Sequence, residues 1–289
     1  MSNETIDRVA LVGGTHGNEL TGIYLLNKYR QFPKLLGQHS FEVELFTANH
    51  EAHRANRRYI DRDLNRSFRQ ADLDDDSLFG HENELAKQIN QKLGPKGSSR
   101  TDMHTSTAPM GINLVLTKTD TFHLMLADYV QQRMDDVSIT LEKLPDHHFL
   151  MSVAPQHVLV EIGATAQGQL RQDVFDKTEQ TTQLIFKFLN EYNNHQLPQP
   201  SECIDVFEYF DVMFLPTDVN GDIAGMVHQD IQDRDFTLLR SGEPMFTLLN
   251  GDDVIYDGED CYISFINEAA YYDEKKAFAM SRKKTFHIG

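Results

Sequence analysis

The sequence of 289 residues is poor in cysteine and in positive charge. Cys203 and Cys261 are the two cysteines, too few for a disulfide framework or a cysteine-rich zinc module, so we expect a reducing compartment. Lys and Arg number 27 against 44 Asp and Glu, and the formal net charge is −17. Because nucleic-acid phosphates demand clusters of Lys and Arg, this balance argues against a nucleic-acid partner.

Targeting and membrane signals are also missing from the sequence. Residues 1–7 are polar and acidic, without a basic segment, and no apolar run approaches the roughly 20 residues that span a bilayer. We therefore expect a cytoplasmic protein that does not bind membranes.

Apolar runs typical of buried strands alternate with segments of helical periodicity through about residue 195, which predicts an α/β layer fold. The predicted strands cover residues 8–12, 43–47, 114–117 and 158–162. The predicted helices cover residues 20–29, 82–93, 122–134 and 173–191.

The composition changes after the last of these helices. Residues 193–201 are rich in Asn, Gln and Pro and read as a linker, and short strands punctuated by Asn-Gly and Asp-Gly pairs follow. We predict a catalytic domain over residues 1–200 and a β-rich domain over residues 201–289 that contributes to the active-site entrance.

A motif with metal-ligand character follows the first predicted strand. His16 and Glu19 lie three residues apart in a glycine-rich loop, and catalytic zinc commonly takes three protein ligands of the His₂Glu type. His104 is the best candidate for the third ligand, because Asp102 two residues before it could orient the imidazole. His50 and His53 are the next candidates. The competing interpretation is a hydrogen-bonded loop histidine beside an ordinary turn.

Two further clusters carry chemistry. Residues 58–68 concentrate three arginines with Asn65 and two acids, and guanidinium groups are preferred for gripping carboxylates, which predicts an anionic substrate. A surface salt-bridge network is the alternative. Glu161 ends an otherwise apolar strand, where burial is costly unless a metal, proton or cation offsets it, so it suits a general base.

These segments together resemble the aspartoacylase family, within the zinc carboxypeptidase-like group that includes succinylglutamate desuccinylase. The resemblance rests on five segments in family order, residues 13–22, 58–61, 63–66, 161–163 and 267–272. It implies a zinc carboxypeptidase-like mixed sheet with flanking helices and zinc-dependent hydrolysis of N-acyl amino acids, with N-acetyl-L-aspartate as the type substrate. It also implies one Zn²⁺ per chain and a possible homodimer.

The resemblance further implies a role for each matching residue. The implied zinc ligands are His16, Glu19 and His104, the general acid/base is Glu161, and the substrate-holding residues are Arg58, Asn65, Arg66 and Tyr271. Arg58 or Arg66 would stabilise the oxyanion, and the other would hold the α-carboxylate with Tyr271. For Tyr271 a packed aromatic is the alternative.

The chain departs from the family pattern at three places. Met151 stands where aspartate-selective members carry an arginine, so we expect weak discrimination against neutral N-acyl amino acids, sharpened towards aspartate by Met151→Arg. Residues 147–150 replace a more hydroxyl-rich stretch. Residues 97–100 replace the usual apolar strand before His104, so the sequence leaves open whether a strand is present there, and Thr105 stands where an Asn is common.

Three classes of function remain open on the sequence. The first is a zinc-dependent amidohydrolase of N-acyl amino acids, including N-acetyl aromatic or N-succinyl-glutamate substrates. The second is a carboxypeptidase for short peptides, and the third is a zinc-binding protein without activity. The presence of His16, Glu19 and Glu161 disfavours the third class.

Overall fold

The computed structural model describes residues 5–94, 98–143 and 149–289. The α-helices are α1 Leu20–Gln31, α2 His50–Arg54, α3 Gln70–Leu73, α4 His81–Leu93, α5 Thr121–Gln131 and α6 Gln172–Asn193. The strands are β1 Arg8–Gly13, β2 Glu42–Thr47, β3 Ser98–Thr105, β4 Gly111–Leu116, β5 Val137–Leu141, β6 Gln156–Gly163, β7 Cys203–Phe214, β8 Gly225–Val227, β9 Thr237–Leu239, β10 Pro244–Leu248, β11 Asp253–Ile255, β12 Cys261–Ser264 and β13 Lys276–His287. Short 3-10 helices are η1 Pro33–Leu36, η2 Leu64–Arg66, η3 Met151–Val153 and η4 Ala269–Glu274.

A large mixed sheet organises the described chain. Ten strands follow one another in the order β2-β1-β3-β6-β4-β5-β7-β13-β12-β9, and β11-β10-β8 form a second sheet. The strands β2, β1, β3 and β6 pair in parallel, whereas β4 runs antiparallel to β6. The predicted α/β fold, with a mixed sheet, flanking helices and a β-rich C-terminal part, is confirmed.

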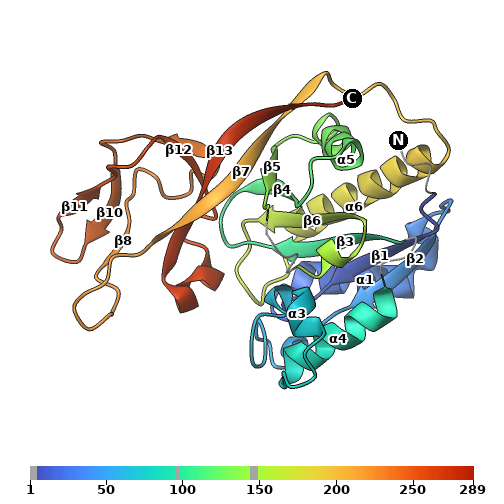
Figure 1. Cartoon of the computed structure of the whole chain (residues 1–289), viewed down its shortest axis with the longest axis horizontal. Coiled ribbons are helices and arrows are strands. Elements are labelled where there is room, and N and C mark those ends of the chain that lie inside the picture. Colours follow the sequence, from blue (N-terminus) through green and yellow to red (C-terminus); the bar gives the residue numbers. More distant parts are fainter. Residues whose placement is uncertain (1–4, 95–97, 144–148) are drawn as a thin grey trace.

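Both faces of the N-terminal half of the sheet are covered, because successive side chains of a strand point to opposite faces. Val9 and Leu11 of β1 belong to the core that includes residues of α1, α5 and α6. Ala10 and Val12 belong to a separate core with residues of α4. Figure 1 shows α5 and α6 on one side of the sheet and α4 on the other. A strand buried on both faces needs an apolar run, which is why β1 was predictable.

The strand β3 settles the local structure before His104, which the sequence left open. It lies in the middle of the sheet between β1 and β6, and its residues from Ser99 to His104 are buried although most are polar. Two of these polar side chains have hydrogen-bond partners: Arg100 Nη1 donates to Leu150 O at 2.8 Å, and Asp102 Oδ1 accepts from Thr15 Oγ1 at 2.9 Å. A search for apolar runs misses such a strand because most of its buried side chains are polar.

The C-terminal part continues the same sheet. After residues 194–202, β7 pairs in parallel with β5 and in antiparallel with β13, and Figure 1 shows these two long strands joining the two parts of the molecule. A separate apolar core there includes Leu239, Ile263 and Phe278. Since β13 follows η4 directly, the shared sheet fixes where η4 lies relative to the N-terminal half.

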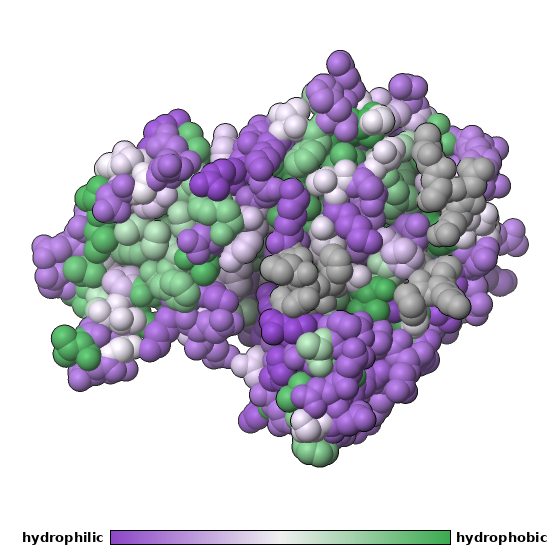
Figure 2. Space-filling model, in the orientation of Figure 1, coloured by the Kyte–Doolittle hydropathy of each residue, from purple (hydrophilic) through white to green (hydrophobic). Residues whose placement is uncertain are grey.

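The visible surface is mostly hydrophilic, and apolar residues gather over the C-terminal strands at the left of Figure 2. None of the helices in the described ranges combines the length and the apolar character required to cross a membrane.

Candidate functional site

The loop between β1 and α1 is shaped by two glycines. Gly14 has φ +73°, a conformation that residues with a Cβ rarely adopt. A Cβ on Gly17 would lie 2.2 Å from the backbone carbonyl carbon of Ala52 and the backbone nitrogen of His53, so only glycine allows this approach. The loop therefore packs tightly against α2 and directs His16 and Glu19 inward.

His16, Glu19 and His104 form the cluster within the described residues that could hold a metal ion, with ligand atoms all within 4.8 Å of one another. Glu19 Oε1 lies 2.6 Å from His16 Nδ1, and Glu19 Oε2 lies 3.0 Å from His104 Nδ1. The two Nδ1 atoms are 3.2 Å apart, and all three side chains are buried. Both imidazoles thus direct the same ring nitrogen to one point beside a carboxylate.

The far ring nitrogens each meet a second carboxylate. His16 Nε2 lies 2.9 Å from Asp63 Oδ1, and His104 Nε2 lies 3.0 Å from Asp102 Oδ2. Histidines that bind metals almost always pair their other nitrogen with a carboxylate or carbonyl group in this way. Two imidazoles and one carboxylate, oriented by two further carboxylates, are the donor set that a catalytic Zn²⁺ takes.

The electrostatics of the cluster agree with a cation site. Burial opposes ionisation of Glu19, yet the charges of His16 and His104 hold the pKa of Glu19 well below its usual value. Burial would lower the pKa of His104, but Asp102 and Glu19 raise it well above the usual value. A proton on His104 therefore balances the surrounding carboxylates where a metal ion would do so, and the two compete.

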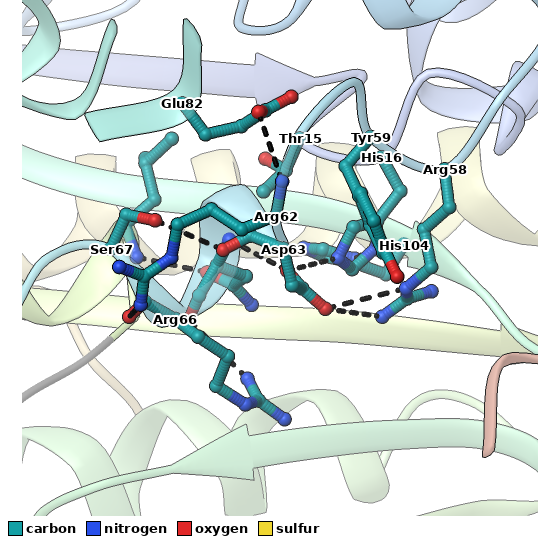
Figure 3. A network of polar contacts seen from close by, with 12 residues as sticks. Thr15, His16, Arg58, Tyr59, Arg62, Asp63, Arg66, Ser67, Glu82 and His104 are labelled. Atoms are coloured by element: carbon teal, nitrogen blue, oxygen red, sulfur yellow. Dashed lines mark hydrogen bonds and ion pairs between the residues drawn. The ribbon is translucent and has the colours of Figure 1, made fainter. Parts of the chain in front are cut away.

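The segment between α2 and α4 supplies Arg58 and Asp63. Arg58 Nη1 donates to Glu19 Oε1 at 3.0 Å, and its Nε and Nη2 donate to Asp63 Oδ2 at 3.3 and 3.1 Å. Figure 3 shows Asp63 between His16 and Arg58, and Arg62 directed to the opposite side. Glu82, fully buried, accepts from the backbone N–H groups of residues 60, 61 and 62 and so fixes this segment.

Glu161 is next to the metal-binding cluster in the sheet. In the parallel pairing of β3 with β6 it lies opposite His104, and partners in a parallel pair direct their side chains to the same face. Burial and the charge of Glu19 raise the pKa of Glu161 well above its usual value. A carboxyl group with a raised pKa holds a proton more readily than an ordinary carboxylate, which suits it to accept and then return a proton.

A pocket opens over this cluster and collects residues from both halves of the chain. It is lined by His16, Glu19, Arg58, Asn65, Arg66, His104, Thr105, Val115, Glu142, Phe149, Leu159, Glu161, Phe265, Glu268, Ala270 and Tyr271. The structure thus brings together every residue that the sequence analysis assigned to ligand, catalytic or substrate roles. Tyr271, predicted to reach back from the C-terminal segment, lines the pocket from η4.

Other candidates from the sequence lie elsewhere. Arg62 Nη1 donates to Asn83 Oδ1 at 3.1 Å, away from the pocket. His50 is exposed and His53 Nδ1 contacts Gly17 O at 3.1 Å, so neither joins the metal-binding cluster. Met151 is fully buried in an apolar cluster with Val115, Phe149 and Leu159, behind the pocket wall. His147 and His148 lie outside the described residues.

Comparisons with known proteins agree with this fold. The model of the succinylglutamate desuccinylase/aspartoacylase catalytic domain matches residues 5–189, and that of the AstE/AspA barrel-sandwich hybrid domain matches residues 202–283. The chain belongs to the succinylglutamate desuccinylase/aspartoacylase family.

Similar members of this family carry two different activities in their names. A probable aspartoacylase of Nostoc sp. is 38% identical over 96% of this chain and 97% of its own length. The N-acyl-aromatic-L-amino acid amidohydrolase (carboxylate-forming) of Xenopus tropicalis is 38% identical over 96% of this chain and 93% of its own length. The crystal structure of murine aminoacylase 3 superposes with a TM-score of 0.93 at 35% identity, covering 99% of this chain and 98% of that one.

Several pocket and supporting residues escaped the sequence analysis. Val115 and Leu159 fall in predicted buried strands and were read as core residues, since an apolar side chain that lines a pocket has the same pattern as one in the interior. Phe149 was noted only as part of the stretch 147–150 that departs from the family pattern. Glu82 sits in the first turn of a helix, where an acidic residue is ordinary. Glu268 is the exception, because it lies within the quoted segment 267–272.

We predict that Asp102→Asn weakens zinc binding by about 10- to 100-fold, because the amide no longer fixes the tautomer and basicity of His104. His104→Ala should remove the zinc. Competition against a chelator of known affinity measures the zinc affinity of each variant, and metal analysis of the purified variants measures the zinc that they retain. Asp120→Asn is the matched control, since Asp120 Oδ1 lies 2.7 Å from His123 Nδ1 in a similar pair that is not part of the metal-binding cluster. Unchanged zinc in His104→Ala would contradict the assignment of the third ligand.

Proposed function

We propose that this protein is a zinc-dependent amidohydrolase that cleaves N-acyl amino acids into a carboxylate and a free amino acid. The observation that carries the proposal is the pocket in which two imidazoles and Glu19 converge, Glu161 stands beside them, and two arginines face the same space. N-acetyl-L-aspartate is the substrate expected from the sequence.

The metal would be held by His16, Glu19 and His104, with Asp63 and Asp102 orienting the two imidazoles. Zinc, when bound, supplies a Lewis acid for the scissile carbonyl and lowers the pKa of water from 15.7 towards about 7. Glu161 would take a proton from the attacking water and deliver it to the leaving nitrogen. Its place opposite His104 in the sheet keeps the carboxylate next to the reacting carbonyl.

The contacts of the two arginines suggest a division of their roles. Arg58 donates to Glu19, so it lies beside the carbonyl that the metal would polarise, and we assign it to the oxyanion. One such donor is worth about 2.7–4 kcal/mol in other hydrolases. Arg66 is exposed and stacks over the ring of Phe149 at 5.0 Å, farther from the ligands, and we assign it with Asn65 and Tyr271 to the α-carboxylate.

We further propose that residues 201–289 act as a domain that completes the active-site entrance. Phe265, Glu268 and Tyr271 line the pocket from this part of the chain. Glu268 Oε2 accepts from Thr107 N at 2.8 Å and from Ser106 Oγ, two residues beyond His104. An entrance narrowed in this way favours a small acyl amino acid over the peptide substrate of a carboxypeptidase.

We predict that Glu161→Gln keeps its zinc and its fold but loses about 10²- to 10⁴-fold in kcat, because the amide cannot accept the water's proton. Steady-state kinetics on the best substrate, with metal analysis, test this. The comparison variant is Glu142→Gln, since Glu142 lines the same pocket from the end of β5 and should lose far less in kcat. A near wild-type kcat in Glu161→Gln would make Glu161 a structural residue.

A second candidate substrate class is supported by the pocket wall. Val115, Phe149 and Leu159 form an apolar side, and Arg58 and Arg66 are the arginines that line the described pocket. Lys143, which follows Glu142 in the chain, pairs with Glu208 at 2.8 Å rather than offering its charge to a second substrate carboxylate. This apolar wall favours N-acyl amino acids that carry neutral or aromatic side chains.

The location of Met151 changes the outcome expected for Met151→Arg. The side chain is fully enclosed by apolar neighbours, so an arginine there would bring an unpaired charge into the cluster. Burying such a charge costs free energy of folding, and the variant should lose stability before it gains selectivity for aspartate.

We predict that wild-type enzyme hydrolyses N-acetyl-L-phenylalanine with a kcat/KM at least comparable to that for N-acetyl-L-aspartate, because an apolar wall rejects neutral side chains weakly. A panel that adds N-succinyl-L-glutamate and a dipeptide separates the alternatives. A preference for N-acetyl-L-aspartate above about 10⁴-fold would refute the apolar subsite and require another cation. Activity on the dipeptide alone would indicate a carboxypeptidase, and none on any member a non-catalytic protein.

A further inference from the structure

Arg100 is an unusual residue for the middle of a central strand. It is fully buried, and the structure gives its guanidinium no carboxylate partner within 4.0 Å among the described residues. Burial lowers the pKa of Arg100 to about 10, so the group remains a cation at neutral pH. A buried, unpaired charge is costly, and its contacts should therefore reveal what it does.

The contacts of Arg100 are two backbone carbonyls. Nη1 donates to Leu150 O at 2.8 Å, and Nη2 donates to Gly94 O at 3.2 Å, at the end of α4. The N–H of Leu150 donates in turn to Asn65 Oδ1 at 2.9 Å. The backbone of Leu150 is thus held at its carbonyl by the central strand and at its N–H by the substrate-binding segment.

The residues on either side of Leu150 belong to the apolar wall of the pocket and to the cluster behind it. Phe149 before it lines the pocket and stacks with Arg66, and Met151 after it packs in the apolar cluster behind Phe149. Arg100 and His104 lie four residues apart on β3, so they direct their side chains to the same face of the strand. One strand therefore holds both a metal ligand and the backbone of the wall.

We propose that Arg100 is a positioning residue for the subsite that receives the substrate's side chain: by holding the Leu150 carbonyl, it fixes the Phe149 wall at a set distance from the metal-binding cluster. This inference rests on the proposed function. It connects two departures of the chain from the family pattern, the polar residues before His104 and the Met at position 151 in place of an arginine. Arg100 binds the backbone next to Met151 from the central strand and does not project into the pocket.

The test compares Arg100→Met with wild type on N-acetyl-L-phenylalanine and N-acetylglycine, which has no side chain. Methionine fills a similar length without donating to either carbonyl. We expect the kcat/KM for N-acetyl-L-phenylalanine, divided by that for N-acetylglycine, to fall about tenfold in Arg100→Met, which is within the range by which pocket fit discriminates substrates. The fall should come from a higher KM for the phenylalanine substrate. Zinc content and kcat on N-acetylglycine should change little.

Arg8→Met is the matched control. Arg8 Nη2 donates to Leu93 O at 2.8 Å, at the same end of α4, but does not contact the wall segment. It should leave the ratio unchanged. In a Phe149→Ala background, Arg100→Met should no longer alter the ratio, because Arg100 acts through Phe149; a purely structural role would give the same loss in both backgrounds.

Amide hydrogen exchange gives a readout that does not depend on any substrate. In Arg100→Met the peptide covering residues 149–154 should exchange at least about tenfold faster than in wild type and in Arg8→Met. If Arg100→Met fails to fold, Arg100→Lys replaces it, because a single ammonium group cannot span the two carbonyls. Unchanged exchange, or an unchanged ratio in an active enzyme, overturns the inference. If the exchange is faster in Arg100→Met but wild type is inactive on every substrate, the positioning role of Arg100 is supported and the proposed function is refuted.

Discussion

The burial of several like charges in one place is the constraint on which the rest of this structure depends. Glu19 and Asp102 are buried beside two imidazoles, and Asp63, whose side chain is 20% exposed, contacts one of them. Carboxylates in such surroundings repel one another unless a cation sits among them. Arg58 donates hydrogen bonds to Glu19 and Asp63 and offsets part of their negative charge. The converging ligand atoms of His16, Glu19 and His104 leave a position where a bound cation would offset the rest.

The central sheet converts this local demand into a site. Its parallel strands β1, β3 and β6 end on the same edge, so the loop after β1, His104 near the end of β3 and Glu161 near the end of β6 meet there. Open α/β sheets bind ligands at this edge because backbone and loops leave a crevice there. The same sheet extends through β7 and β13 into the C-terminal part, which carries η4 and Tyr271 to the pocket.

Polar residues inside the sheet serve geometry more than stability. Arg100, Asp102 and His104 occupy alternate positions of one strand. Arg100 binds the backbone of the wall segment, Asp102 orients the imidazole of His104, and His104 belongs to the metal-binding cluster. An apolar strand would fold at lower cost, since each of these side chains loses hydration on burial. The added cost is consistent with positions selected for the site rather than for the core.

The sequence by itself determined the elements that local patterns encode. The apolar runs of β1 and β6 and the periodicity of α4 and α6 predicted their places to within a few residues, and the spacing of His16 and Glu19 pointed to a metal, because strand burial and ligand type are local properties. Only the tertiary structure decided that β3 is a strand, since its polar side chains find partners far along the chain. It also decided that Arg62 turns away from the pocket, that Met151 lies behind the wall and that Glu82 shapes the arginine segment. Each of these depends on contacts between residues distant in sequence, which no local pattern records.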